Sequence, residues 1–259
     1  MRWDERQRAM LREMGIKLWS PQLDPLRASA SAPLPPAERG AGEALASHVG
    51  DTGAGPVVES VSTVATLDWP ALRAAVAACT ACKLCESRRQ TVFGVGNERA
   101  HWMIVGEAPG EQEDRQGEPF VGKSGQLLDN MLRALGLTRG DAEPARQVYI
   151  ANTLKCRPPG NRNPAPDELA KCEAFLVRQV QLVRPKIILA MGAFAVQSLL
   201  RSSEPVGRLR GRVHRYQGVP LIVTYHPAYL LRNPVDKAKA WDDLCLAAET
   251  AAAASEASR

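Results

Sequence analysis

Trp102-Met-Ile-Val-Gly-Glu-Ala-Pro-Gly110 has the pattern of a short apolar strand that runs directly into a glycine loop. An apolar run of this length, closed by Gly and Pro, indicates a buried strand with a tight turn at its carboxyl end. The loop is not a Walker A motif, because Gly-Lys-Ser/Thr is missing, and its third glycine is wrongly spaced for a dinucleotide fingerprint. A plain strand-to-loop turn therefore explains this segment as well as a binding site does.

Downstream of this strand, apolar segments alternate with helical patterns. The predicted strands are 102–105, 148–152, 186–190 and 219–224, and the predicted helices are 124–135, 166–184, 193–200 and 237–254. Strands that alternate with helices of this length indicate a mostly parallel sheet with helices on both faces. We therefore expect an α/β fold, a three-layer αβα sandwich with a central, mostly parallel four-stranded sheet.

The carboxyl ends of these strands are followed by loops of unusual composition. In open parallel sheets, ligands bind in the crevice beyond those ends. The loops at that edge are 106–110, 152–163, 191–192 and 226–232. The sequence thus predicts one binding site where the four loops converge.

The amino-terminal quarter of the chain differs from the rest. Residues 4–19 have the pattern of a short amphipathic helix, which could recruit a protein partner, and residues 20–66 are rich in Ala, Pro, Gly and Ser. A segment so poor in large apolar residues does not fold alone. Asp68 is a candidate N-cap for the first helix of the folded part. The expected organisation is a disordered extension, a folded domain and a short tail, over residues 1–66, 67–254 and 255–259.

The chain has 259 residues and a formal net charge of +5, which permits a nucleic-acid partner without requiring one. Basic residues crowd two segments near the predicted site, where they could contact phosphates or form a solvated face. They are Arg201, Arg208, Arg210, Arg212 and Arg215 in one segment, and Lys155, Arg157 and Arg162 in the other. No apolar run reaches the roughly 18 residues of a membrane span, so no membrane segment is expected.

Four cysteines form two widely separated pairs, Cys79-x2-Cys82 and Cys156-x15-Cys172. Four thiolates without a matching histidine suit zinc or an iron–sulfur cluster, and the long second spacing favours the cluster. The alternative is that some of them are small buried hydrophobic residues. Disulfides are not expected, because the charged start of the chain has no signal region and indicates a reducing cytoplasm.

Three side chains near the predicted site could recognise a planar ligand. Phe120, in Gly117-Glu-Pro-Phe-Val-Gly122, could stack on a base or pack in the core. Asn152, at the end of a strand, could read a base edge or satisfy a turn. His226 precedes a proline and so takes extended geometry, from which it could stabilise a developing anion.

Four motifs in order give the chain a specific resemblance. GEAPGEQED, GEPFVGKSGQLLD, NTLKCRPPGNRNP and HPAYLLR, with the two cysteine pairs, resemble the family 4 uracil-DNA glycosylases. These are the iron–sulfur members of the uracil-DNA glycosylase superfamily. The resemblance implies a monomeric enzyme of the bacterial cytoplasm and nucleoid, which flips uracil out of DNA and hydrolyses its N-glycosidic bond to begin base excision repair.

The resemblance also implies a role for each matched residue. The implied ligands of a [4Fe–4S] cluster are Cys79, Cys82, Cys156 and Cys172. The implied catalytic positions are Glu107, Ala108, Glu113 and His226, and those that contact uracil are Phe120, Asn152 and Asn161. The expected contacts to DNA are Tyr229, Leu230, Leu231, Arg232, Arg210 and Arg212.

Ala108 stands where other branches of the superfamily keep a carboxylate or amide that positions water. Because alanine cannot activate water, we expect catalysis to depend on stabilising the leaving uracil anion and the sugar cation. A rival interpretation is a non-catalytic iron–sulfur module that binds single-stranded or damaged DNA in a repair or replication assembly. The segment 4–19 would then hold the partner.

Overall fold

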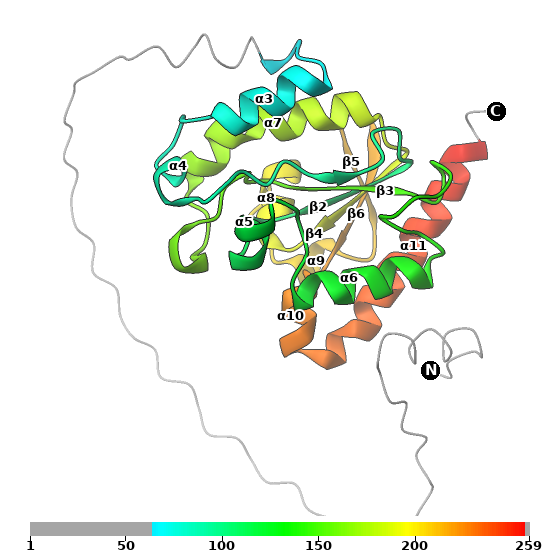
Figure 1. The fold of residues 1–259 in the computed structure, drawn as a ribbon. Helices are drawn as coiled ribbons and strands as arrows, with labels where there is room; N and C mark the ends of the chain where they lie inside the picture. The colour runs from blue at the N-terminus through cyan, green and yellow to red at the C-terminus, as the bar shows by residue number, and fades with distance from the viewer. Residues whose placement is uncertain (1–63, 257–259) are drawn as a thin grey trace, which may run out of the picture.

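A mixed sheet of six strands runs through the middle of the computed structural model, which describes residues 64–256 (Figure 1). The strands are β1 Val95–Gly96, β2 Trp102–Gly106, β3 Val148–Asn152, β4 Ile187–Met191, β5 Val213–Tyr216 and β6 Val219–Thr224. Their order is β1-β3-β2-β4-β6-β5. The four inner strands pair in parallel, and β1 and β5 pair antiparallel at the two edges.

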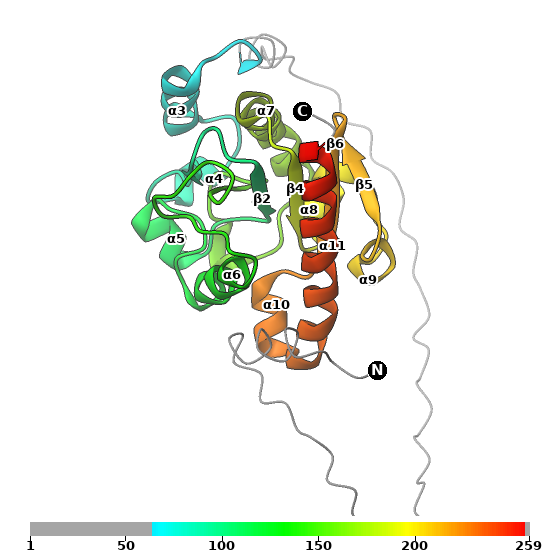
Figure 2. The same cartoon turned by 90° about the vertical axis from the view of Figure 1, so that its right-hand side faces the viewer.

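Helices cover both faces of this sheet. They are α3 Trp69–Ala78, α4 Leu84–Ser87, α5 Glu111–Gln116, α6 Lys123–Ala134, α7 Pro166–Val183, α8 Ala193–Leu200, α9 Val206–Leu209, α10 Pro227–Arg232 and α11 Lys237–Glu256, with 3-10 turns η1 Pro159–Asn161 and η2 Pro234–Asp236. In Figure 1, α3 and α7 lie on one side of the sheet, and α6 and α11 lie on the other. Figure 2 shows the β5–β6 hairpin on the opposite side of the molecule from α4 and α5.

The inner strands are buried on both faces. In β2, Ile104 packs in the cluster that includes α6 and α11, whereas Met103 and Val105 pack in the cluster that includes α7 and α8. All five residues of β2 are buried, as are those of β3 and β4. Parallel strands covered on both faces appear in a sequence as continuous apolar runs, which is why all four inner strands were predictable. The α/β architecture with helices on both faces is confirmed.

The prediction of four strands is wrong, because the sheet has two further strands at its edges. β1 is only two residues long, and the residues of β5 alternate between exposed and half-buried. Neither strand carries an apolar run. The β5–β6 hairpin turns at Gln217 and Gly218, which have φ of 48° and 83°. Two positive φ angles at the centre of a two-residue loop define a turn whose twist suits a hairpin.

Two short helices lie where loops were expected. α5 covers the acidic run after the glycine loop, where Glu113 caps the helix by accepting the N–H of Gly110 at 3.1 Å. α10 covers most of the segment that follows His226. The first long helix begins as predicted, with Asp68 accepting the N–H of Ala71 at 3.0 Å.

The predicted helix 4–19, most of the predicted linker 20–66 and the end of the tail 255–259 lie outside the described residues. Val64 is buried and packs against the cluster that contains Leu72, so the folded part begins before residue 67. Within residues 64–256, no helix has both the length and the apolarity needed to cross a bilayer.

Arg210 is partly exposed and is bonded to α11. Its Nε donates to Asp243 Oδ2 at 3.0 Å, and Asp243, which is fully buried, also accepts the N–H of Gly211 at 3.2 Å. Because its guanidinium compensates a buried carboxylate, Arg210 has a structural role, and its contact with DNA stays a prediction.

We expect Asp243→Ala to lower the free energy of unfolding by about 3–5 kcal/mol, because it leaves Arg210 partly buried without its anion. Urea denaturation followed by circular dichroism measures this loss. Glu173→Ala is the control, since it removes an ion pair with Arg201 whose side chain is 70% exposed. That pair should contribute about 0–1 kcal/mol. Equal losses in the two variants would contradict a structural role for Asp243.

Candidate active site

An open cleft of about 610 Å³ lies beyond the carboxyl ends of β2, β4 and β6, a size that suits a nucleotide. All four predicted loops contribute to its lining. The lining residues include Glu107, Ala108, Asn161, Arg162, Gly192, Phe194, Tyr225, His226, Tyr229 and Arg232. The prediction that these loops converge is confirmed.

His226 is the N-cap of α10, and its backbone is extended, with φ of −66° and ψ of 138°, as the following proline predicts. Its Nδ1 accepts the N–H of Ala228 at 3.1 Å. Burial, with a smaller contribution from Arg232, lowers the pKa of His226 to about 4. The neutral ring accepts at Nδ1, so it carries its proton on Nε2 and offers a neutral donor.

The ring of Phe120 stacks on His226, with centroids 5.3 Å apart and planes inclined by 26°. Phe120 has φ of 56°, a left-handed conformation that few residues with a side chain adopt. Such a conformation costs about 1–3 kcal/mol and persists only where the surroundings fix it. Phe120 is 5% exposed, packs in the core cluster and is not among the residues that line the cleft, so core packing is confirmed and ligand stacking stays a prediction.

Asn152 ends β3 and pairs in register with Gly106. Its Oδ1 is buried and has no hydrogen-bond partner among the residues that the structure describes. A Cβ atom on Gly106 would lie 2.5 Å from this oxygen and 2.6 Å from Cζ of Phe120. Only glycine lets the amide and the ring converge here, and a buried acceptor without a partner is costly unless a ligand or water satisfies it.

Glu107 is held at the start of α8. Its Oε1 accepts the N–H of Phe194 at 3.0 Å, and burial raises the pKa of the carboxyl group. Gly192, with φ of 94°, permits this approach, because a Cβ there would lie 2.4 Å from Oε1. This anchor was not predicted from the sequence, although a glycine directly after a buried strand was the available signal. Ala108 lines the cleft and contributes no polar group.

Glu113 and Asn161 both hold loops. Oε1 of Glu113 accepts the N–H of Val121 at 3.0 Å, while Oε2 accepts that of Gly110, so both oxygens are engaged. Oδ1 of Asn161 accepts from Nε of Arg157 at 2.8 Å, at the rim of the cleft. Neither group is placed as a free base, and their roles stay predictions.

The predicted DNA-contacting segment after His226 divides along the faces of α10. Tyr229 and Arg232 line the cleft, and Leu231 is 44% exposed. Leu230 is fully buried in the core cluster, so the prediction that Leu230 contacts DNA is wrong. Leu231 is exposed although Leu230 is buried, because successive residues of a helix lie on different faces.

The remaining basic residues are dispersed. Arg212 is exposed but does not line the cleft. Arg162 does line it, and both its terminal nitrogens bond to Glu168. Lys155 is fully buried, and its Nζ donates to the carbonyl of Asn152 at 2.8 Å and to Oε1 of Gln179 at 2.6 Å. A phosphate contact by Lys155 is therefore excluded.

The four paired cysteines line one small pocket, together with Cys85. Nη1 of Arg88 donates to Sγ of Cys156 at 3.1 Å, and the N–H of Lys155 donates to Sγ of Cys172 at 3.3 Å. Such N–H···S bonds suit thiolates that bind a metal. Within residues 64–256 the sulfurs are not gathered at the distances of a metal site, so the pocket supplies a fitting donor set without a formed coordination sphere.

Burial is the main influence on these thiols. It raises the pKa of Cys172 to about 12 and also raises the pKa of Cys156. Burial has the opposite effect on Lys155, whose pKa it lowers to about 8. The nearby thiols of Cys172 and Cys156 raise this pKa and so offset part of the decrease. A buried ammonium whose acidic neighbours are thiols is consistent with a site that carries negative charge when filled.

Comparisons with known proteins agree with this geometry. Residues 93–245 match the family model described as the uracil DNA glycosylase superfamily. The type-4 uracil-DNA glycosylase of Archaeoglobus fulgidus is 43% identical over 167 residues, 61% of this chain and 81% of that protein. That of Pyrobaculum aerophilum is 38% identical over 190 residues, 70% of this chain and 93% of that protein.

A type-5 uracil-DNA glycosylase of Pyrobaculum aerophilum is also similar, at 34% identity over 149 residues, which cover 53% of this chain and 66% of that protein. The type-4 relatives thus match more of the chain at higher identity. From the family model and these relatives, this chain belongs to the uracil-DNA glycosylase superfamily and, within it, to the type-4 uracil-DNA glycosylases.

Proposed function

We propose that this protein binds uracil flipped out of DNA and hydrolyses the bond between N1 of uracil and C1′ of the sugar. The observation that carries the proposal is Oδ1 of Asn152, which is buried beside the ring of Phe120 and has no partner within residues 64–256. An aromatic face next to an amide with a free acceptor recognises a flat ring that has a donor on its edge. Uracil has such a donor at N3, whereas cytosine has an acceptor there.

The base would stack on the part of Phe120 that His226 leaves uncovered. Centroids 5.3 Å apart leave no room for a third ring between the two side chains. A base that lies edge to edge with His226, however, can share the face of Phe120 with it. In that position Nε2–H of His226 points to O2 of uracil, and the amide of Asn152 meets N3–H and O4.

In the reaction, the C1′–N1 bond breaks and its electron pair passes to the uracil ring. The neutral His226 stabilises the negative charge that develops on O2, as a fixed donor does in an oxyanion hole. The anchored carboxylate of Glu107 stabilises the positive charge on the sugar and accepts a proton from the water that adds to C1′. With alanine at position 108, no second carboxylate assists this water.

We assign the cysteine pocket to a [4Fe–4S] cluster held by Cys79, Cys82, Cys156 and Cys172. The N–H···S bonds from Arg88 and Lys155 support this assignment. When bound, the cluster supplies a structural crosslink between distant segments, and ligation of this kind restricts the unfolded chain. Lys155 would transmit this order to the base site, because its ammonium holds the carbonyl of Asn152.

Contacts to DNA are assigned to the rim formed by Tyr229, Leu231 and Arg232. Tyr229 donates to Asp236 at 2.7 Å and stacks on Tyr225, which makes the rim rigid. Leu231 is an exposed apolar side chain of this rim, and it can fill the gap left by a flipped base. We place the protein in the cytoplasm, at the nucleoid, as a monomer, with segment 4–19 available to a protein partner.

The test is release of free uracil from a labelled oligonucleotide that contains one deoxyuridine. A glycosylase leaves an abasic site and free base in equal amounts. The rival, a non-catalytic module that binds damaged DNA, would retain the oligonucleotide without releasing uracil. Nothing in such a module would require the free acceptor on Asn152 or the neutral donor on His226.

We expect His226→Ala to lower the single-turnover rate by about 10²–10³, the usual effect of removing one oxyanion donor, with little change in affinity for DNA. His214→Ala is the control, because that ring bonds to the carbonyl of Leu209 outside the cleft. Rapid-quench measurement of uracil release compares the two variants. A rate close to wild type in His226→Ala would place the oxyanion donor elsewhere.

The pH dependence provides a second check on His226. Because burial holds its pKa near 4, below its ordinary value of 6.5, the ring stays neutral as the pH falls from 7 toward 5. The contribution of His226 to the rate should therefore persist through this range and decline only near pH 4. The ratio of the wild-type rate to the His226→Ala rate isolates this contribution, because titration of Glu107 affects both proteins. A fall of that ratio centred on pH 6.5 would show that the ring titrates normally.

We expect Asn152→Asp to abolish uracil release, because a carboxylate cannot donate a hydrogen bond to O4. The same variant should permit weak release of cytosine, because the carboxylate can accept a hydrogen bond from the amine of that base. Release of free base from separate oligonucleotides, with one deoxyuridine or one deoxycytidine, measures this change in specificity. Asn130→Asp, on α6 and outside the cleft, is the matched control. Unchanged uracil release in Asn152→Asp would show that another residue reads the base.

We expect purified wild-type protein to be brown, with about four irons and four sulfides per chain. Replacement of any of the four assigned cysteines by serine should remove the colour and lower the thermal midpoint. Cys85→Ser and Cys245→Ser are the controls and should keep both. Stoichiometric zinc and no visible absorbance in anaerobic preparations would show that the four cysteines bind zinc and not a cluster.

A further inference from the structure

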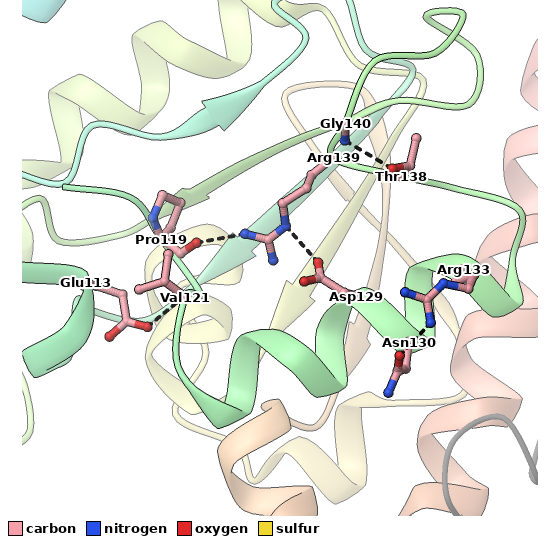
Figure 3. Close-up of polar contacts among 9 residues, drawn as sticks. All are labelled: Glu113, Pro119, Val121, Asp129, Asn130, Arg133, Thr138, Arg139 and Gly140. Carbon is pink, nitrogen blue, oxygen red and sulfur yellow. Dashed lines mark hydrogen bonds and ion pairs between the residues drawn. The ribbon is translucent and has the colours of Figure 1, made fainter. Parts of the chain in front are cut away.

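The loop that carries Phe120 is fixed on both sides by side chains from other elements (Figure 3). On its carboxyl side, Oε1 of Glu113 accepts the N–H of Val121 at 3.0 Å. On its amino side, Nη1 of Arg139 donates to the carbonyl of Pro119 at 3.0 Å. Each of the two neighbours of Phe120 is therefore bonded through its backbone to a different part of the fold.

Arg139 is itself anchored to α6. Its Nε donates to Oδ1 of Asp129 at 2.7 Å, and its side chain is only 20% exposed. The same helix approaches Phe120 from another direction, because a Cβ on Gly125 would lie 1.7 Å from the carbonyl oxygen of Phe120. Helix α6 therefore holds this loop in two ways, through the bond of Asp129 to Arg139 and through the close contact of Gly125 with Phe120.

We propose that Arg139 is a positioning residue that keeps the ring of Phe120 in place to stack on the base. This inference rests on the proposed function. Phe120 has a left-handed φ of 56°, and such a conformation persists only where several contacts fix it. Glu113 fixes the backbone after the ring. Without Arg139, the carbonyl of Pro119 loses its partner, the left-handed backbone at Phe120 loses one of the contacts that fix it, and the ring shifts from its place beside Asn152 and His226.

A direct contact between Arg139 and DNA is the competing explanation. The side chain of Arg139 is only 20% exposed, two of its guanidinium nitrogens bond to Asp129 and Pro119, and the third, Nη2, is buried. Its loss should therefore displace one ring without weakening the attraction of the protein for phosphates. The two explanations differ in what happens to the affinity for DNA that contains no uracil.

The first measurement follows the ring itself in the holoprotein. The chain has four phenylalanines, so protein labelled with 4-fluorophenylalanine gives four fluorine resonances, and Phe120→Leu assigns one of them. We expect Arg139→Gln to shift or broaden the Phe120 resonance alone, because glutamine cannot bond to Asp129 and Pro119 together. Arg133→Gln is the matched control. Arg133 lies one helical turn after Asp129 on α6. It bonds to Oδ1 of Asn130 at 2.8 Å, away from the loop (Figure 3).

The second measurement is kinetic. We expect Arg139→Gln to lower the single-turnover rate of uracil release by about 10–100-fold, the effect of a misplaced group. Its dissociation constant for uracil-free DNA should equal that of wild type. In a Phe120→Leu background, Arg139→Gln should cause no further loss, because the ring that it positions is already absent. Arg133→Gln should behave as wild type throughout.

Three results would overturn the proposal. They are a fluorine spectrum unchanged from that of Arg133→Gln, losses that multiply in the double variant, and weaker binding to uracil-free DNA, which would indicate a phosphate contact. If Arg139→Gln does not fold, Asp129→Ala removes the anchor of Arg139 and should move the same resonance. If wild-type protein releases no uracil, the proposed function fails, while the fluorine comparison still decides whether Arg139 positions Phe120.

Discussion

The candidate site depends on the absence of a side chain at Gly106. A Cβ there would lie 2.5 Å from Oδ1 of Asn152 and 2.6 Å from Phe120, so any other residue would separate the amide from the ring. Gly106 is also the last residue of β2, where the strand gives way to the loop with Glu107 and Ala108. Gly106 thus joins the sheet to the amide that we propose reads the base and to the ring on which we propose the base stacks. The strain in Phe120 is tolerated because the surrounding contacts leave this ring little freedom.

A second dependence runs between the cysteine pocket and the cleft. The carbonyl of Glu107 accepts the N–H of Leu154 at 3.1 Å, and Lys155 bonds to the carbonyl of Asn152 at 2.8 Å. The segment that leaves β3 is therefore attached to the catalytic loop before it reaches Cys156. Order at the cysteines and order at the base site are parts of one hydrogen-bonded structure. A metal centre of purely structural role would affect catalysis through these contacts.

The sequence predicted those parts of the molecule that depend on local patterns. The inner strands are apolar throughout because both faces are covered, and His226 is extended because a proline follows it. Contacts between distant residues could not be predicted. Nothing near Arg210 indicates that its partner is Asp243, 33 residues away, and the burial of Leu230 beside an exposed Leu231 follows only once α10 is known to be a helix. Likewise, the motif around Phe120 is visible, but its attachment to Arg139 depends on how α6 packs.

The short edge strands have a consequence for the behaviour of the protein in concentrated solution. A sheet with a long open edge offers unpaired backbone groups to any other chain and invites ordered aggregation. Here β1 spans only two residues and β5 four, and Arg215 of β5 bonds back to the carbonyl of Gly218 in its own turn. The four parallel strands are thereby enclosed between short edge strands, which offer few unpaired backbone groups. Short edges of this kind leave little backbone on which the strand of another molecule could pair.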